Sequence, residues 1–166
     1  MGMQLIETIE VGAGGAASIE FTGIPQDGVD LQVVVSGRAQ NAVYTSVMLM
    51  ELNGITTGNS YIRIVGTGSS VSSSGGSGSV IGIAAGGTST ANTFGSTGIT
   101  IPNYTVNSVK VASADGVGEN NDTPSIIQPV AYKTNITNAV TSLKLLLSGT
   151  TFAEYSTASL YKITAD

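Results

Sequence analysis

Apolar and polar residues alternate along most of this chain, in short runs that end at glycine, asparagine or proline. A period of two places successive side chains on opposite faces of an extended strand, whereas an amphipathic helix needs a period near 3.6. Residues 18–22, Ser-Ile-Glu-Phe-Thr, alternate in this way and stop at the turn-forming cluster of residues 23–28. The pattern therefore predicts an all-β protein.

About ten short strands are expected, because turn signals recur roughly every 8–12 residues. Successive strands without intervening helices favour antiparallel pairing, and the spacing is typical of a β-sandwich or barrel. The length of 166 residues fits one domain, residues 1–166, that can bury a core without disulfides. The expected strands cover residues 4–11, 18–22, 30–38, 46–52, 61–65, 80–84, 98–101, 108–113, 125–132, 142–147 and 158–164.

Two connections between these strands carry specific predictions. Asn53-Gly54 is the strongest short-range hairpin signal in the chain. Residues 66–79 are nearly all Gly, Ser and Thr, which predicts a flexible loop. This loop is either a solvated spacer or an arm that becomes ordered against a neighbouring subunit.

The composition removes most of the usual catalytic groups, since the chain has no cysteine, histidine or tryptophan. Without histidine there is no ordinary proton shuttle at neutral pH. Without cysteine there is no thiolate nucleophile, no disulfide and no sulfur ligand for a metal. We therefore expect a non-enzymatic protein, and the sequence assigns no catalytic, cofactor-binding or metal-ligating residue.

The charge pattern argues against several kinds of partner. Net charge is −5, and only 10% of the residues are charged, against roughly 25% in ordinary domains. The six basic residues form no patch, so we expect no nucleic-acid or membrane partner. No apolar stretch predicts a transmembrane helix and no leader peptide is expected, which favours synthesis in a cytoplasm. The basic residues are Arg38, Arg63, Lys110, Lys133, Lys144 and Lys162.

Acidic residues offer two kinds of chemistry. The loop of residues 115–122 holds Asp115, Glu119, Asn120 and Asp122, which have oxygens of the kind that calcium prefers. Their spacing does not match the twelve-residue calcium loop; a polar turn is favoured, and calcium binding is left open. Glycoside hydrolysis needs two opposed carboxylates, and the sequence pairs none of the other candidates. These are Glu7, Glu10, Glu20, Asp27, Asp30, Glu51 and Glu154.

Aromatic residues bear on sugar binding, because binding modules present exposed rings to their ligands. Phe21 and Phe152 are expected in the core. The candidates for exposed rings are Tyr44, Tyr61, Tyr104 and Tyr155.

Eight segments, taken in order, resemble small all-β virion proteins of tailed bacteriophages, a family common in phages of cyanobacteria and marine bacteria. The resemblance covers most of the chain and carries no set of functional residues. The segments are 4–11, 14–25, 31–38, 52–54, 93–96, 99–105, 119–121 and 155–161.

The resemblance implies a jelly-roll-like antiparallel sandwich with a structural role in the virion. We expect a capsid decoration (cement) protein that binds the outer shell, bridges subunits of the major capsid protein and associates with itself, as a trimer. Residues 66–79 would then suit the arm interpretation. The alternative is a tail or fibre module that binds a receptor carbohydrate, and a glycan depolymerase is the third hypothesis.

Overall fold

The computed structural model describes residues 2–119, 121 and 125–165. These residues form twelve strands, and no helix lies among them. The strands are β1 (Gly2–Glu10), β2 (Ser18–Phe21), β3 (Asp30–Gly37), β4 (Thr45–Leu52), β5 (Ser60–Gly66), β6 (Val71–Ser77), β7 (Val80–Ala85), β8 (Gly95–Ile101), β9 (Val111–Gly118), β10 (Ile126–Lys133), β11 (Leu143–Leu147) and β12 (Thr157–Thr164).

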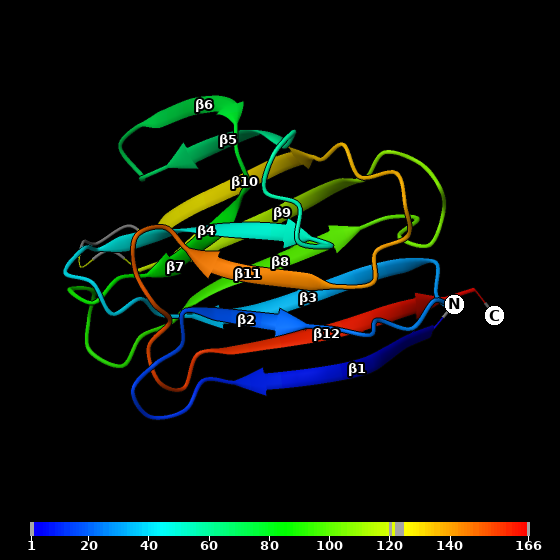
Figure 1. Cartoon of the computed structure of the whole chain (residues 1–166). Coiled ribbons are helices and arrows are strands. Elements are labelled where there is room, and N and C mark those ends of the chain that lie inside the picture. The colour runs from blue at the N-terminus through cyan, green and yellow to red at the C-terminus, as the bar shows by residue number, and fades with distance from the viewer. Residues whose placement is uncertain (1, 120, 122–124, 166) are drawn as a thin grey trace.

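Two antiparallel sheets pack face to face, which confirms the predicted β-sandwich (Figure 1). The large sheet has eight strands in the order β1-β12-β3-β8-β9-β10-β5-β6. The small sheet has four strands in the order β2-β11-β4-β7. Both chain ends lie together at one end of the large sheet, because the first strand pairs with the last.

Eight of the strands form a jelly roll. If β5, β6, β9 and β10 are set aside, the first strand pairs with the last, the second with the next to last, and so on inward. The resulting pairs are β1–β12, β2–β11, β3–β8 and β4–β7. This nested pairing is the jelly-roll arrangement of two four-stranded halves, as the family resemblance implied.

The other four strands are two insertions into the jelly roll. The β5–β6 hairpin lies between β4 and β7 in sequence, and the β9–β10 hairpin lies between β8 and β11. Both join the large sheet beyond β8, because β10 pairs with both β9 and β5. The large sheet is therefore twice as wide as the small one and extends past it (Figure 1).

A single cluster of buried side chains fills the space between the sheets. The alternation seen in the sequence produces it: β4 and β9 each bury every second residue. Phe21 and Phe152 are both buried, as expected. Burying a side chain of this size contributes about 1.5–3 kcal/mol, so the core supplies the main driving force for folding.

The glycine- and serine-rich segment of residues 66–79 is not a loop, so that prediction is wrong. Residues 71–77 form β6, which pairs with β5 over seven consecutive residues. Serine and glycine are poor strand formers, and local composition therefore predicted a loop. The ladder of backbone hydrogen bonds to β5 overrides that weak local preference.

Asn53-Gly54 forms a tight turn but not the expected hairpin. Both residues have positive φ, +50° and +70°, and the Ile55 N–H donates to the Leu52 oxygen. These are the features of a two-residue turn. However, β4 pairs with β11 and β7, while β5 joins the other sheet. The local turn was predicted correctly, and the pairing of the strands around it was not.

The expected strand of residues 108–113 lies further along the chain, as β9. Residues 115–118, the first half of the predicted polar loop, belong to this strand. Asp115 and Val117 point to the solvent, and the two buried residues between and after them are glycines, so this half of the loop supplies one carboxylate and no cluster. Two of the oxygen donors proposed for that loop, Asn120 and Asp122, lie outside the described residues.

Candidate interaction surface

Several charged side chains hold the fold together rather than form a site. Lys110 is almost fully buried, with 1% of its surface exposed. Its Nζ donates to the backbone oxygens of Val106, Ser108 and Thr137, the last two at 2.7 Å and 3.4 Å. Burial lowers the pKa of Lys110. The residue therefore ties two loops together.

Two ion pairs link strands and turns in the described part of the chain. Lys162, on β12, donates to both carboxylate oxygens of Asp27 at 2.6 Å. The Lys162 hydrogen bond lowers the pKa of Asp27. Lys144, on β11, lies 3.4 Å from Glu20 and is also the cross-strand neighbour of Glu51. Three of the seven candidate carboxylates thus lie beside a lysine.

Arg38 stabilises the loop of residues 86–94. Its guanidinium donates to the backbone oxygens of residues 87, 89, 90 and 93 at 2.7–3.2 Å. The Glu119 carboxylate accepts from the Thr90 N–H at 2.8 Å and from the Asn121 N–H at 2.5 Å. Burial acts to raise the pKa of the Glu119 carboxyl. The hydrogen bonds from these backbone donors outweigh that effect, so the pKa is lowered. The Glu119 carboxylate therefore stabilises the backbone of this loop.

No group of three or more acidic residues that could hold a metal ion occurs within the described ranges. Asp115 lies on the outer face of β9, whereas Glu119 bonds to the loop beside it. The structure therefore does not bring these two candidates for calcium binding together as one cluster.

The tyrosines differ in exposure, and one prediction about them is wrong. Tyr44 and Tyr155 are exposed, by 57% and 64%, and Tyr61 is half-buried. Tyr104 is fully buried, because its hydroxyl reaches the turn before β3 and bonds to Pro25 and Gly28. Tyr104 cannot present its ring to a ligand.

One polar cleft lies among the loops, with a volume of about 620 Å³. Tyr155 has a φ of +66°, an unusual backbone conformation for so large a residue. The neighbouring Glu154 charge raises the pKa of the Tyr155 phenol, which stays a neutral hydrogen-bonding group. The cleft combines aromatic and amide groups; its lining residues are Arg38, Gln40, Asn92, Phe94, Ala153, Glu154 and Tyr155.

The outer face of the large sheet is apolar over the half made by β9, β10, β5 and β6. Residues paired across these strands share a face, so the register places the exposed apolar side chains together. Within the described residues, the only charged groups on this outer half-face belong to Asp115 and Lys133. Six large apolar residues there are 45% to 77% exposed: Ile62, Ile64, Val71, Val111, Val117 and Ile127. We call this surface the outer apolar face.

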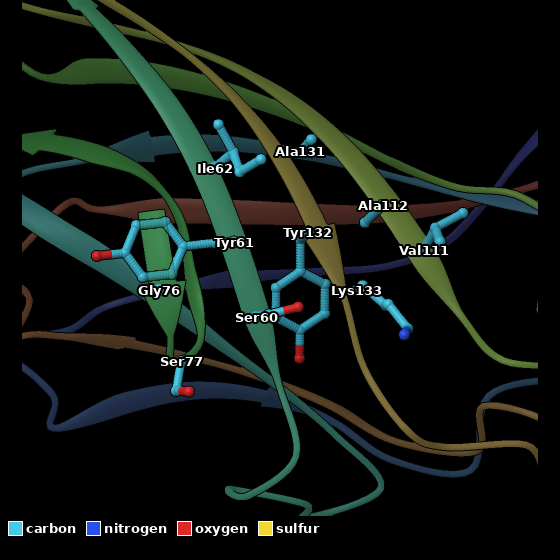
Figure 2. Close-up of a pocket in the computed structure, with 10 residues that line it drawn as sticks. All are labelled: Ser60, Tyr61, Ile62, Gly76, Ser77, Val111, Ala112, Ala131, Tyr132 and Lys133. Atoms are coloured by element: carbon cyan, nitrogen blue, oxygen red, sulfur yellow. The ribbon is translucent and has the colours of Figure 1, made fainter. Parts of the chain in front are cut away.

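A groove of about 590 Å³ crosses one end of the outer apolar face (Figure 2). Its lining comes from all four strands, with Ile62, Val111 and Ala131 among the side chains on the outer face. Tyr132 points to the inner side, where burial raises its pKa to about 12. The phenol is therefore neutral at physiological pH. The groove offers mainly apolar contact; its ionisable lining residues are Lys133 and the two tyrosines, Tyr61 and Tyr132, and no carboxylate is among them.

Sequence reasoning missed the outer apolar face, although part of the signal was present. In β5, Ile62 and Ile64 alternate with Tyr61, Arg63 and Val65, so apolar residues occupy both faces of the strand. Such a run indicates a strand covered on both sides. The structure places Ile62 and Ile64 on the outer face, away from the small sheet, where both are exposed.

No protein-family model matches the chain, and no curated protein matches it either. The described residues include no helix with the length and hydropathy needed to cross a membrane.

Proposed function

We propose that this chain is a non-enzymatic structural protein of a phage virion, and that it binds the outer capsid shell as a decoration protein. The observation that carries this proposal is the outer apolar face, with its six exposed apolar residues. Soluble monomers rarely expose large contiguous apolar patches, and such patches mark interaction sites. The ordered resemblance of the eight segments favours a virion as the place of that interaction.

The proposed mechanism is stabilisation by mass action. A protein that binds the assembled shell and not its free subunits adds stability that grows with the logarithm of its excess over its dissociation constant. At a thousandfold excess this is about 4 kcal/mol per site. Bridging of neighbouring subunits, including contacts between copies of this chain as a trimer, would distribute that energy over the shell.

The nature of the surface makes a specific claim about this binding. Because the described residues of the outer apolar face include two charged groups, of opposite sign, its association with the shell depends little on Coulomb attraction. Binding should therefore persist at 1 M salt, where the Debye length is about 3 Å. A partner held by charge would be released under the same conditions.

The test is co-sedimentation of the purified protein with capsids of the phage that encodes it. We expect saturable binding that Ile62→Asp weakens at least tenfold, because Ile62 is 64% exposed on the outer apolar face. Ile55→Asp is the matched control, since Ile55 is 40% exposed but lies in the turn after β4. Absence of binding to capsids, or location of the protein on the tail, would refute the proposal.

The polar cleft supports a second candidate, a tail module that binds a receptor carbohydrate. The exposed Tyr155 ring could stack on a sugar, and Asn92 and Glu154, which line the same cleft, could form hydrogen bonds to its hydroxyl groups. This function would be favoured if the protein bound a glycan on an array, and if Tyr155→Ala abolished that binding while Tyr44→Ala left it unchanged. Tyr44 is the control because it is exposed but does not line the cleft.

A further inference from the structure

We propose that the free edge of β6 binds an extended strand of a partner protein, in antiparallel register. That strand carries large apolar side chains on one face and a carboxylate on the other. The inference deepens the proposed function, because it gives the chemistry of the partner at the same surface, and it rests on that proposal for the origin of the strand.

The backbone of β6 points a regular set of hydrogen-bonding groups away from β5. The bonds from Thr67 N to Ser70 O and from Gly78 N to Asn59 O, both 3.0 Å, fix the phase of the ladder. Paired residues in an antiparallel ladder alternate between bonded and non-bonded pairs. The N–H and C=O groups directed away from β5 therefore belong to Val71, Ser73, Gly75 and Ser77. Because β6 ends the large sheet, no described strand takes these groups.

The other three sheet edges are protected, and β6 is not. β1 carries Glu7 and Glu10 and has a bulge between Leu5 and Glu7. β2 is only four residues long, and every residue of β7 is buried. Charges, bulges, short strands and covered strands are the usual means of blocking an edge. β6 has seven exposed residues, an unbroken register, and no charge or proline.

Side-chain shape selects a foreign strand over a second copy of β6. On the outer apolar face Gly75 lies opposite Ile62, and Ser73 lies opposite Ile64. Both isoleucines are exposed, by 64% and 46%, because their neighbours on β6 are small. A large apolar residue opposite Gly75 can lean over the strand and cover Ile62, as in the aromatic rescue of edge glycines. A second β6 would bring only serine, glycine and valine to these positions.

Charge selects the other face of the incoming strand. Arg63 is half-buried on the inner face of β5, and its Nε donates to the Ser74 hydroxyl at 2.9 Å. The ion pairs of the described chain involve Lys144 and Lys162, and no carboxylate there lies within ion-pair distance of Arg63. A residue opposite Ser74 shares this face, and non-bonded pairs bring side chains close together. A glutamate at that position can therefore reach the guanidinium.

The probe that follows is the heptapeptide Val-Thr-Ile-Glu-Ile-Thr-Val, extended by two lysines and a fluorescein. In antiparallel register its isoleucines lie opposite Gly75 and Ser73, and its glutamate lies opposite Ser74. Fluorescence anisotropy should show saturable binding to the wild-type protein. Replacing the glutamate with lysine should weaken binding several-fold, and this difference should disappear in Arg63→Gln.

Two variants of Ser73 and two methylated peptides distinguish binding at the strand edge from nonspecific adsorption. Ser73→Pro removes an N–H that points away from β5, so the β5–β6 ladder stays intact, and proline is tolerated on edges. We expect at least tenfold weaker binding to Ser73→Pro and unchanged binding to the matched Ser73→Ala. In the peptide, methylating the backbone nitrogens of the valines and isoleucines should abolish binding, while methylating those of the threonines and glutamate should not.

The peptide methylation arm leaves the protein unchanged, so it holds even if Ser73→Pro folds poorly. The inference is overturned if wild-type protein gives no saturable binding, or if both methylated peptides bind like the parent. Capsids distinguish it from the proposed function. Peptide binding without capsid binding removes the virion role alone, whereas capsid binding that persists in Ser73→Pro removes strand docking alone.

Discussion

Tyr104→Phe tests how much a single buried hydroxyl stabilises the turn of residues 25–28, which precedes β3. Tyr104 is fully buried; its Oη donates to the Pro25 carbonyl and accepts from the Gly28 N–H at 3.2 Å. These two bonds hold the turn of residues 25–28 against the segment that follows β8. Removing the hydroxyl leaves a donor and an acceptor without their partner.

The expected loss depends on how far water can replace those two hydrogen bonds. A buried polar group left without a partner costs about 1–3 kcal/mol. Pro25 is exposed and Gly28 is half-buried, so water can replace part of the interaction. We therefore expect Tyr104→Phe to lower the free energy of unfolding by about 1–2 kcal/mol. For a chain of this size the melting temperature should fall by about 2–8 °C.

Urea unfolding followed by circular dichroism measures this change, with an unchanged m value. Tyr161→Phe is the matched control, because Tyr161 lies on the outer face of β12 and its hydroxyl has no hydrogen-bond partner in the described residues. This control should change stability by less than about 0.5 kcal/mol. If Tyr104→Phe were as stable as Tyr161→Phe, the Oη bonds would not stabilise the turn.

Further predictions concern the core, the Asp27–Lys162 pair and two glycines. Leu145→Ala should cost about 2–5 kcal/mol in urea unfolding, because Leu145 is fully buried between β2 and β4; a loss below 1 kcal/mol would mean that the core collapses around the change. Asp27 has a lowered pKa, so its contribution to stability is present above the pKa of the unfolded state and is lost as pH falls through the lower, folded value. Thermal melts between pH 2 and 6 should show a larger loss in the wild type than in Asp27→Asn, which keeps the other carboxyl with a lowered pKa, Glu119. Gly54→Ala should cost about 1–2 kcal/mol, since Gly54 has a φ of +70°. Gly12→Ala, at a position with open space and no positive φ, should be neutral or stabilising by up to about 1 kcal/mol, so equal effects would contradict the conformational argument.

The candidate surface was predictable only in part. A charge-poor surface suited to packing against other subunits follows from composition, and the position of the outer apolar face does not. The reason is that β5 carries apolar residues on both faces, so only the pairing of the strands shows that Ile62 and Ile64 lie on the outer face, away from the small sheet. Likewise, Tyr104 and Tyr155 are the same type of residue in similar polar segments, yet one is buried by a turn more than seventy residues away in sequence.

By itself the sequence determined the all-β class, most of the strands and the sharp turn at Asn53-Gly54, because alternation and turn chemistry act between residues close in the chain. The tertiary structure alone decided that β4 and β5 part into different sheets and that the serine–glycine segment becomes β6. It also decided that β1 pairs with β12. These pairings join residues far apart in sequence, where the choice among possible partners depends on which arrangement buries the most apolar surface at once.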